Sequence, residues 1–415
     1  MTLNLNASMA EVTRLTRAGR LAEAMALLQG SARKPNTPEA PEGDDREPIK
    51  TTLPGGGQVI DMMPPRSGSD HWTVPSVDAR QHTATSLAEG LGLPRMPEAM
   101  REILERHAKR RPSSSLWGSV GDLGGAAKTS LPEGARFRER TYANEAGSRT
   151  YKLYIPSCYR EEPLPLIVML HGCKQSPDDF AAGTQMNELA EEQGFLVAYP
   201  AQPSSANPAK CWNWFSAGDQ LRDRGEPSLI AGITRQIIRD VAVDPARVYI
   251  AGLSAGGAAA AIMGLAYPDL YAAIGVHSGL ACGAAKDMPS AFAAMRQGGS
   301  RLMEAAKLPL PTIVFHGDRD TMVSPVNGDQ VITQSRAAAE FHLTINRGQS
   351  AGGINYTQTI QADGNGCPIL EQWVLHGAGH AWSGGSPAGS YTDPRGPDAS
   401  REMLRFFREH PRHPI

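Results

Sequence analysis

A serine flanked by glycines occupies a position suited to nucleophilic chemistry. Ser254 lies in the sequence GLSAGG (residues 252–257), after an apolar run at residues 247–251 and before an alanine-rich stretch. A strand, a GxSxG turn and a helix form a nucleophile elbow, in which the glycines avoid clashes at a strained turn. A serine hydroxyl is a poor nucleophile without a neighbouring base. The pattern therefore predicts Ser254 as a nucleophile that requires a histidine and an acid elsewhere in the chain.

The acid and the histidine should follow the serine in that order. His380 lies in a glycine-containing loop after an expected strand and is the candidate general base, with His376 on the strand side as the alternative. Asp320 and Asp318 both follow the strand expected at residues 311–315. Asp320 is preferred as the acid that fixes the histidine tautomer. The alternative interpretation of Asp318 is a loop residue that caps its own turn.

The oxyanion formed when a carbonyl group is attacked needs backbone N–H donors. Ala255 directly follows the serine and is expected to supply one, while Cys173, in the loop after an early strand, is expected to supply the other. His171 in the same loop is interpreted as a brace for that loop. His277 and His316 lie at expected strand ends and are interpreted as core histidines with satisfied hydrogen bonds.

Strands and helices alternate from residue 135 to the end of the chain. Short apolar or alternating runs predict strands at residues 137–142, 150–155, 165–170, 195–199, 248–252, 272–277, 311–315 and 372–375, the first two as a hairpin. Helical spacing predicts helices at residues 186–193, 229–241, 255–266 and 399–409. This alternation predicts an α/β domain at residues 135–415, with a doubly wound, mostly parallel sheet covered on both faces.

The N-terminal part of the chain has a different character. Residues 1–30 place apolar side chains at helical spacing and predict an amphipathic helix, which packs on the main domain or binds an apolar surface such as a storage granule. Residues 31–134 are rich in Pro, Gly and Ser and predict a largely irregular, partly disordered extension, with a short helix at residues 97–110.

Composition limits the classes of function. The chain has 415 residues, with 41 basic and 43 acidic side chains and a net charge of −2, so no overall field favours nucleic acid or an anionic membrane. No apolar run reaches membrane-spanning length, and the N-terminus lacks the pattern of a secretory signal, which predicts a cytoplasmic protein. Five scattered cysteines are too few for a disulfide framework, and none forms a CxxC pair.

Several short motifs, in order, resemble those of the polyhydroxybutyrate depolymerase-like esterases. The motifs are HGCKQ (171–175), CWNWF (211–215), GLSAGG (252–257), HGDRD (316–320), GHAW (379–382) and GPDAS (396–400). The resemblance covers about residues 135–412 and implies an α/β-hydrolase fold that cleaves esters through an acyl-enzyme at Ser254, with Asp320 and His380. It implies poly(3-hydroxybutyrate), its oligomers or related short-chain esters as substrates, and hydrolysis of this kind requires no metal or cofactor.

The resemblance leaves alternatives open. The same family includes feruloyl and acetylxylan esterases, and a granule-binding protein without catalysis is a separate hypothesis. Trp212, Trp214 and Trp382 lie beside the motifs and suit a pocket for an apolar polyester, with core packing as the other interpretation. The motifs that contain Cys173 and Cys211 are expected near the site, so a disulfide is open, although a reducing cytosol argues against assuming it.

Overall fold

The computed structural model describes residues 131–412, apart from residues 301, 305–308 and 337–339. The helices predicted at residues 1–30 and 97–110 lie outside the described residues, as does almost all of the predicted irregular extension.

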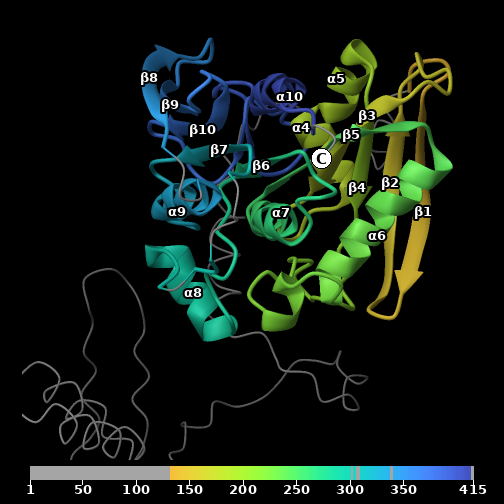
Figure 1. Cartoon of the computed structure of the whole chain (residues 1–415), viewed down its shortest axis with the longest axis horizontal. Coiled ribbons are helices and arrows are strands. Elements are labelled where there is room, and N and C mark those ends of the chain that lie inside the picture. The colour runs from red at the N-terminus through yellow and green to blue at the C-terminus, as the bar shows by residue number, and fades with distance from the viewer. Residues whose placement is uncertain (1–130, 301, 305–308, 337–339, 413–415) are drawn as a thin grey trace, which may run out of the picture. The chain divides into compact units, whose positions relative to one another are not determined.

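A ten-stranded sheet runs through this part of the chain, in the order β1-β2-β4-β3-β5-β6-β7-β10-β9-β8 (Figure 1). Neighbouring strands from β4 to β10 in this order pair in parallel. At one side β2 pairs antiparallel with β4 and β1, and at the other β9 pairs antiparallel with β10 and β8. The strands are β1 (Arg136–Asn144), β2 (Gly147–Ile155), β3 (Leu164–Leu170), β4 (Leu196–Pro200), β5 (Val243–Leu253), β6 (Ala273–His277), β7 (Thr312–Gly317), β8 (His342–Gln349), β9 (Asn355–Ala362) and β10 (Pro368–Leu375). The predicted mostly parallel sheet and its initial hairpin are confirmed.

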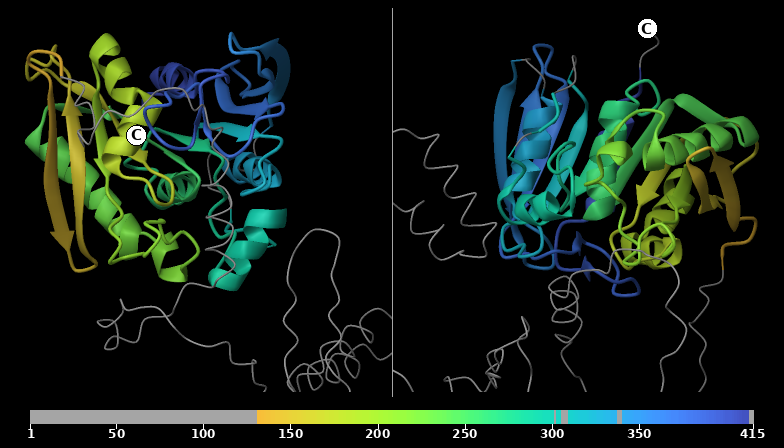
Figure 2. Two further views of the ribbon diagram at one scale, coloured as in Figure 1. Left: turned by 180° about the vertical axis from the view of Figure 1, so that it is seen from behind. Right: turned by 90° about the horizontal axis from the view of Figure 1, so that it is seen from below.

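Helices cover both faces of the sheet (Figures 1 and 2). One face carries α6 (Gly225–Asp240), α7 (Ala255–Ala266) and α9 (Val326–Ser335), and the other carries α4 (Pro177–Thr184), α5 (Met186–Gln193) and α10 (Ala399–Glu409). A further helix, α8 (Met288–Gln297), packs beside α9. Between residues 131 and 412, none of the described helices combines the length and the hydropathy that a membrane span requires.

Two helices show how the sequence determines their packing. Helix α10 is strongly amphipathic and buries Met403, Phe406 and Phe407, and the Phe407 ring stacks on Tyr249 of β5 with centroids 4.9 Å apart. Helix α7 consists almost entirely of small residues and is buried nearly all round, because it lies directly against β3, β5 and β6. Both helices have the bounds that the sequence predicts.

The β8–β9 hairpin was not predicted. Its strands have the sequences HLTINRGQ and NYTQTIQA, which carry polar residues on both faces. Leu343 and Ile345 of the outer strand are 60% and 56% exposed. With so few apolar residues, these strands lack the long alternating apolar pattern from which a strand is recognised.

Candidate active site

Ser254 lies between β5 and α7, at the carboxyl edge of the parallel strands. Its backbone has φ 58° and ψ −119°, a conformation that residues with a side chain rarely adopt. Strain of this kind costs about 1–3 kcal/mol and persists only where the surroundings enforce it. The Ser254 amide donates a hydrogen bond of 2.9 Å to the carbonyl of His277, which fixes the turn against the end of β6.

Gly252 and Gly256 are required because three backbone segments meet at this turn. A Cβ atom on Gly252 would lie 2.4 Å from the carbonyl group of Gly256, and one on Gly256 would lie 2.0 Å from the carbonyl oxygen of Leu170. No side chain fits at such distances. The two glycines are therefore needed because β3, β5 and α7 approach one another closely. Their backbone conformation does not require glycine, since neither residue has a positive φ.

Asp320 follows β7 and is buried. Its Oδ1 atom accepts hydrogen bonds of 2.9 Å from the amides of Met322 and Val323, and its Oδ2 atom lies 2.7 Å from Nδ1 of His380. His316 Nε2 donates to the Val323 carbonyl at 2.9 Å and lies 3.4 Å from the same Oδ2 atom. The buried Nδ1 atom of His316 has no partner among the described residues, so the prediction of a fully satisfied core histidine is wrong for His316. Burial alone would raise the pKa of Asp320, but the two histidines hold this pKa well below its ordinary value. Asp320 is therefore a carboxylate aimed at one nitrogen of His380.

The two aspartates after β7 have different partners. Asp318 pairs with His376, whose Nδ1 lies 3.0 Å from Oδ2, and it accepts a hydrogen bond of 2.7 Å from the amide of Gly377. Asp320 pairs with His380. Asp318 therefore anchors the loop after β10. The sequence had instead suggested that Asp318 caps its own turn. His380 is half-buried and His376 is exposed, which separates the two candidate bases.

His277 joins the serine turn to the histidine loop. Its carbonyl accepts the Ser254 amide, and its Nε2 atom accepts a hydrogen bond of 3.0 Å from the amide of Ser383, shortly after His380. The ring stacks against Phe315 and Trp382. Burial and the neighbouring histidines lower the pKa of His277 to about 3. It is therefore a neutral core histidine with satisfied hydrogen bonds, as the sequence indicates.

The loop at residues 171–175 passes beside Ser254. A Cβ atom on Gly172 would lie 3.6 Å from the Cβ atom of Ser254. Cys173 forms a disulfide with Cys211, a pairing that the sequence left open. The Lys174 amide donates to the Ala209 carbonyl at 2.7 Å, whereas within the described part of the chain the Cys173 amide has no backbone acceptor. The Cys173 amide thus remains the candidate for the second oxyanion donor.

Gln175 was not among the predicted site residues. Its Oε1 atom accepts a hydrogen bond of 2.8 Å from the Gly172 amide, and its Nε2 atom donates to Asp179 at 2.9 Å and to the Ser390 carbonyl at 3.0 Å. These partners tie the 171–175 loop to the segment that follows His380. No local pattern marks this role, because Ser390 is 215 residues away in the sequence.

The three tryptophans lie in the core. Trp212 and Trp382 are 0% and 1% exposed, and Trp214 is 6% exposed. The Trp212 indole N–H donates to the His171 carbonyl and that of Trp382 donates to the Ser400 hydroxyl, each at 3.1 Å. Of the two interpretations that the sequence left open, this burial agrees with core packing and not with a pocket wall. The indoles of Trp212 and Trp382 therefore hold neighbouring segments from within the core.

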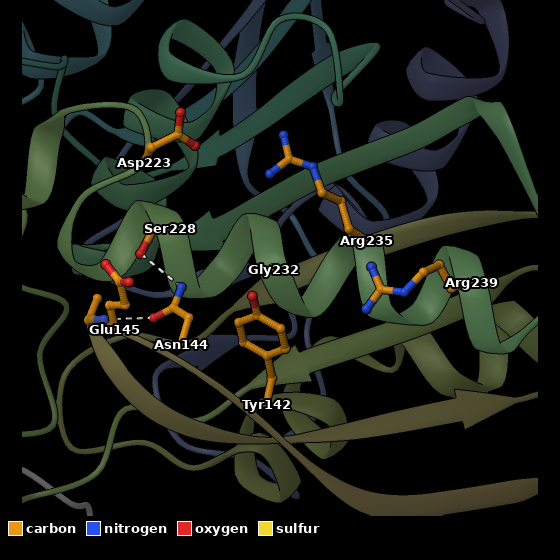
Figure 3. Close-up of a pocket in the computed structure, with 9 residues that line it drawn as sticks. Tyr142, Asn144, Glu145, Asp223, Ser228, Gly232, Arg235 and Arg239 are labelled. Carbon is orange, nitrogen blue, oxygen red and sulfur yellow. Dashed lines mark hydrogen bonds between the residues drawn. The ribbon is translucent and has the colours of Figure 1, made fainter.

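A cavity of about 300 Å³ lies elsewhere, between the β1–β2 turn and α6 (Figure 3). It is lined by Tyr142, Arg235 and Arg239, among others, and the Tyr142 ring packs against Gly232, where a Cβ atom would lie 2.2 Å away. None of its lining residues belongs to the group around Ser254. Across the described residues, no cluster of three or more His, Cys, Asp or Glu side chains could hold a metal ion.

A serine at a strand–helix turn, with an Asp–His pair after β7 and β10 of the same sheet, defines the α/β-hydrolase class. The acetyl xylan esterase from Aspergillus awamori has the same fold, with a TM-score of 0.51 and 20% sequence identity over 66% of this chain and 99% of that chain.

The chain belongs to the family described as Esterase PHB depolymerase, whose profile matches residues 149–352. Poly(3-hydroxyalkanoate) depolymerase C of Paucimonas lemoignei is 32% identical over 52% of this chain and 54% of its own length. Feruloyl esterase B of Neurospora crassa is 31% identical over 64% of this chain and 89% of its own length. The chain thus spans about half of the depolymerase and most of the esterase. The family resemblance seen in the motifs is confirmed.

Buried neutral histidines make the stability depend on pH. Burial lowers the pKa of His171 to about 4 and that of His277 to about 3. The unfolded chain binds protons at these sites near pH 6.5 and the folded protein does not, so the free energy of unfolding should fall as the pH drops from 7 to 5. Each histidine contributes a slope of up to about 1 kcal/mol per pH unit. Urea unfolding at several pH values measures this slope. His277→Phe should reduce the slope by about half, because His171 still contributes. A wild-type free energy of unfolding that does not change between pH 7 and 5 would contradict the presence of neutral, buried histidines.

The disulfide should stabilise the fold. It links cysteines 38 positions apart, and closing a loop of this length restricts the unfolded chain by about 2–4 kcal/mol. The double variant Cys173→Ser/Cys211→Ser should lower the free energy of unfolding by that amount in urea titrations. Cys158→Ser, at an exposed free cysteine, is the matched control and should leave the midpoint unchanged. Superimposable curves for the double variant and wild type would rule out a stabilising bridge.

Proposed function

We propose that the protein hydrolyses carboxylic esters through an acyl-enzyme on Ser254, and that its substrates are poly(3-hydroxybutyrate)-type polyesters, their oligomers and related short-chain esters. One observation carries the proposal. The buried Asp320 carboxylate lies 2.7 Å from Nδ1 of His380, at the sheet edge where Ser254 is held in a strained turn.

The protonation of His380 follows from its partner. A carboxylate only accepts hydrogen bonds, so the proton of the neutral ring lies on Nδ1 and Nε2 is left as the base. In acylation, Nε2 takes the Ser254 proton as Oγ attacks the ester carbonyl, and Asp320 stabilises the resulting imidazolium. Collapse of the tetrahedral intermediate breaks the bond to the alcohol, which leaves with the proton from His380.

Deacylation repeats these steps with water. His380 removes a proton from water as its oxygen attacks the acyl carbonyl, and then returns a proton to Ser254 Oγ as the carboxylic acid departs. In both tetrahedral intermediates the negative oxygen is bound by the amides of Ala255 and Cys173. Ala255 opens α7, so the N-terminal end of the helix dipole also favours the anion. We call residues 171–175 the oxyanion loop.

The polyester substrate is supported by the family and by one relative. The matching family is described as Esterase PHB depolymerase, and the relative from Paucimonas lemoignei is a poly(3-hydroxyalkanoate) depolymerase. A second candidate substrate is a feruloylated or acetylated carbohydrate. The observation in its favour is the feruloyl esterase of Neurospora crassa, of which the chain covers 89%.

The substrate class is tested by parallel hydrolysis of p-nitrophenyl butyrate, 3-hydroxybutyrate oligomers, a feruloylated arabinose ester and acetylated xylan. We expect wild type to cleave the butyrate and the oligomers. Ser254→Ala should lose about 10⁴-fold or more of kcat, because no other group can form the acyl-enzyme. Cleavage of the carbohydrate esters alone would replace the polyester proposal with the second candidate, and a folded wild type that cleaves none of them would end the esterase proposal.

The role of Asp320 is tested against Asp318, which lies two residues away and binds the other histidine of the loop. Asp320→Asn should lower kcat by about 10³–10⁴-fold, because the amide no longer holds the His380 tautomer that leaves Nε2 basic. Asp318→Asn is the matched control and should lose less than about tenfold, since it affects only loop anchoring. Equal losses in the two variants, measured by steady-state kinetics on p-nitrophenyl butyrate, would remove the distinction.

A further inference from the structure

Glu226 is a buried carboxylate that the proposed mechanism does not use. It lies in the first turn of α6 and is 5% exposed. We propose that Glu226 is a positioning residue that holds the oxyanion loop, and with it the Cys173 amide, in place beside Ser254. This inference rests on the proposed function, because it assigns a role in binding the oxyanion.

The donors around Glu226 come from three separate segments. Its Oε2 atom accepts a hydrogen bond of 2.8 Å from the Asn213 amide, and its Oε1 atom accepts one of 2.7 Å from Asn213 Nδ2. Gln202 Nε2 also donates to Oε1, and Arg149 Nη2 lies 3.4 Å from the same atom. Every partner is a donor, so the site is built for a group that only accepts.

The first connection to the oxyanion loop passes through Gln202. Its side chain is fixed by Arg149 Nε, which donates to Oε1 at 3.0 Å, and by the Cys211 carbonyl, which accepts from Nε2 at 2.9 Å. The Gln202 backbone amide donates to Nε2 of His171 at 3.1 Å. A single residue, Gln202, thus links Glu226 to His171, the first residue of the oxyanion loop.

The second connection passes through residues 211–213. Asn213 is held at both its backbone and its side chain by Glu226. Cys211, two positions before Asn213, forms the disulfide with Cys173. The indole of Trp212, the residue between Cys211 and Asn213, donates to the His171 carbonyl at 3.1 Å. A shift of Asn213 would therefore be transmitted through the disulfide to the residue whose amide is proposed to bind the oxyanion.

His171 fixes the orientation of the loop. Its Nδ1 atom lies 2.8 Å from the Gly172 carbonyl oxygen, which only accepts, so Nδ1 carries the proton. Its Nε2 atom faces the Gln202 amide, which only donates, so Nε2 is unprotonated. Both contacts are satisfied by one neutral tautomer, and burial lowers the pKa of His171 to about 4, which keeps the ring neutral. The position of Gln202, set by Glu226, thereby determines how the loop is held.

The expected effect is on the transition state. Loss of one oxyanion donor costs about 10²–10³-fold in kcat, because the donor acts only on the developing charge. Glu226→Gln places an NH₂ group among donors and displaces the loop without removing the Cys173 amide. We therefore expect kcat to fall by about 10–100-fold with KM changed less than about threefold. The inhibition constant of n-butylboronic acid, which forms a tetrahedral adduct with a serine, should rise by a similar factor.

Glu371 provides a matched control. It is also fully buried and its Oε1 atom also accepts from a glutamine, an arginine and an N–H donor, namely Gln358, Arg405 and the Trp373 indole. It lies on β10, and none of these partners belongs to the oxyanion loop or to residues 211–213. Glu371→Gln should lower the Tm as Glu226→Gln does, but should keep the wild-type kcat and boronic acid inhibition constant.

The experiment measures kcat, KM, Tm and the boronic acid inhibition constant for wild type and both variants. Wild-type kinetics in Glu226→Gln, or an equal loss of kcat in Glu371→Gln, would overturn the inference while leaving the esterase proposal intact. If Glu226→Gln does not fold, Gln202→Ala is used in its place, because it removes the side chain that joins Glu226 to the first connection. A lower kcat with weaker boronic acid binding in Gln202→Ala supports the inference. Wild-type values overturn it. A folded wild type without esterase activity would overturn the proposed function and this inference together.

Discussion

The negative charge of Asp320 is the constraint on which the geometry of the site depends. A carboxylate removed from water is unfavourable unless hydrogen bonds and opposite charge compensate for the lost solvation. Here the amides of Met322 and Val323 bind one oxygen, while His380 and His316 face the other. The carboxylate thus joins the turn after β7 to the loop after β10. His380 is held on the side of the sheet edge where α7 begins, and its second nitrogen remains available.

Buried neutral imidazoles join the remaining loops. The His277 ring accepts from the Ser383 amide in the histidine loop, while the backbone carbonyl of the same residue accepts from the Ser254 amide. The His171 ring connects the oxyanion loop to Gln202. An imidazole suits this role because its neutral form donates at one nitrogen and accepts at the other. The cost of burying a charge is avoided, since burial lowers both pKa values.

Local patterns in the sequence were sufficient for strands β1 to β7 and β10, for α7 and for the position of Ser254, because strand, turn and helix periodicities are short-range signals. They could not show that Asp318 binds His376, or that Glu226 binds Asn213, because these contacts depend on how separate elements pack together. The tryptophans illustrate the same limit: proximity to a motif in sequence does not determine which side of the loop faces the core. The β8–β9 hairpin was not predicted because its strands, HLTINRGQ and NYTQTIQA, contain few apolar residues.

The central claim, that Ser254 is the nucleophile of an esterase, is tested most directly by covalent trapping. A p-nitrophenyl alkylphosphonate reacts with an activated serine, releases p-nitrophenolate and leaves a stable adduct that resembles the tetrahedral intermediate. The account predicts release of one p-nitrophenolate per chain, with the phosphonyl mass on the peptide that contains Ser254. An adduct on any other residue, or ester hydrolysis that continues unchanged after treatment, would contradict it.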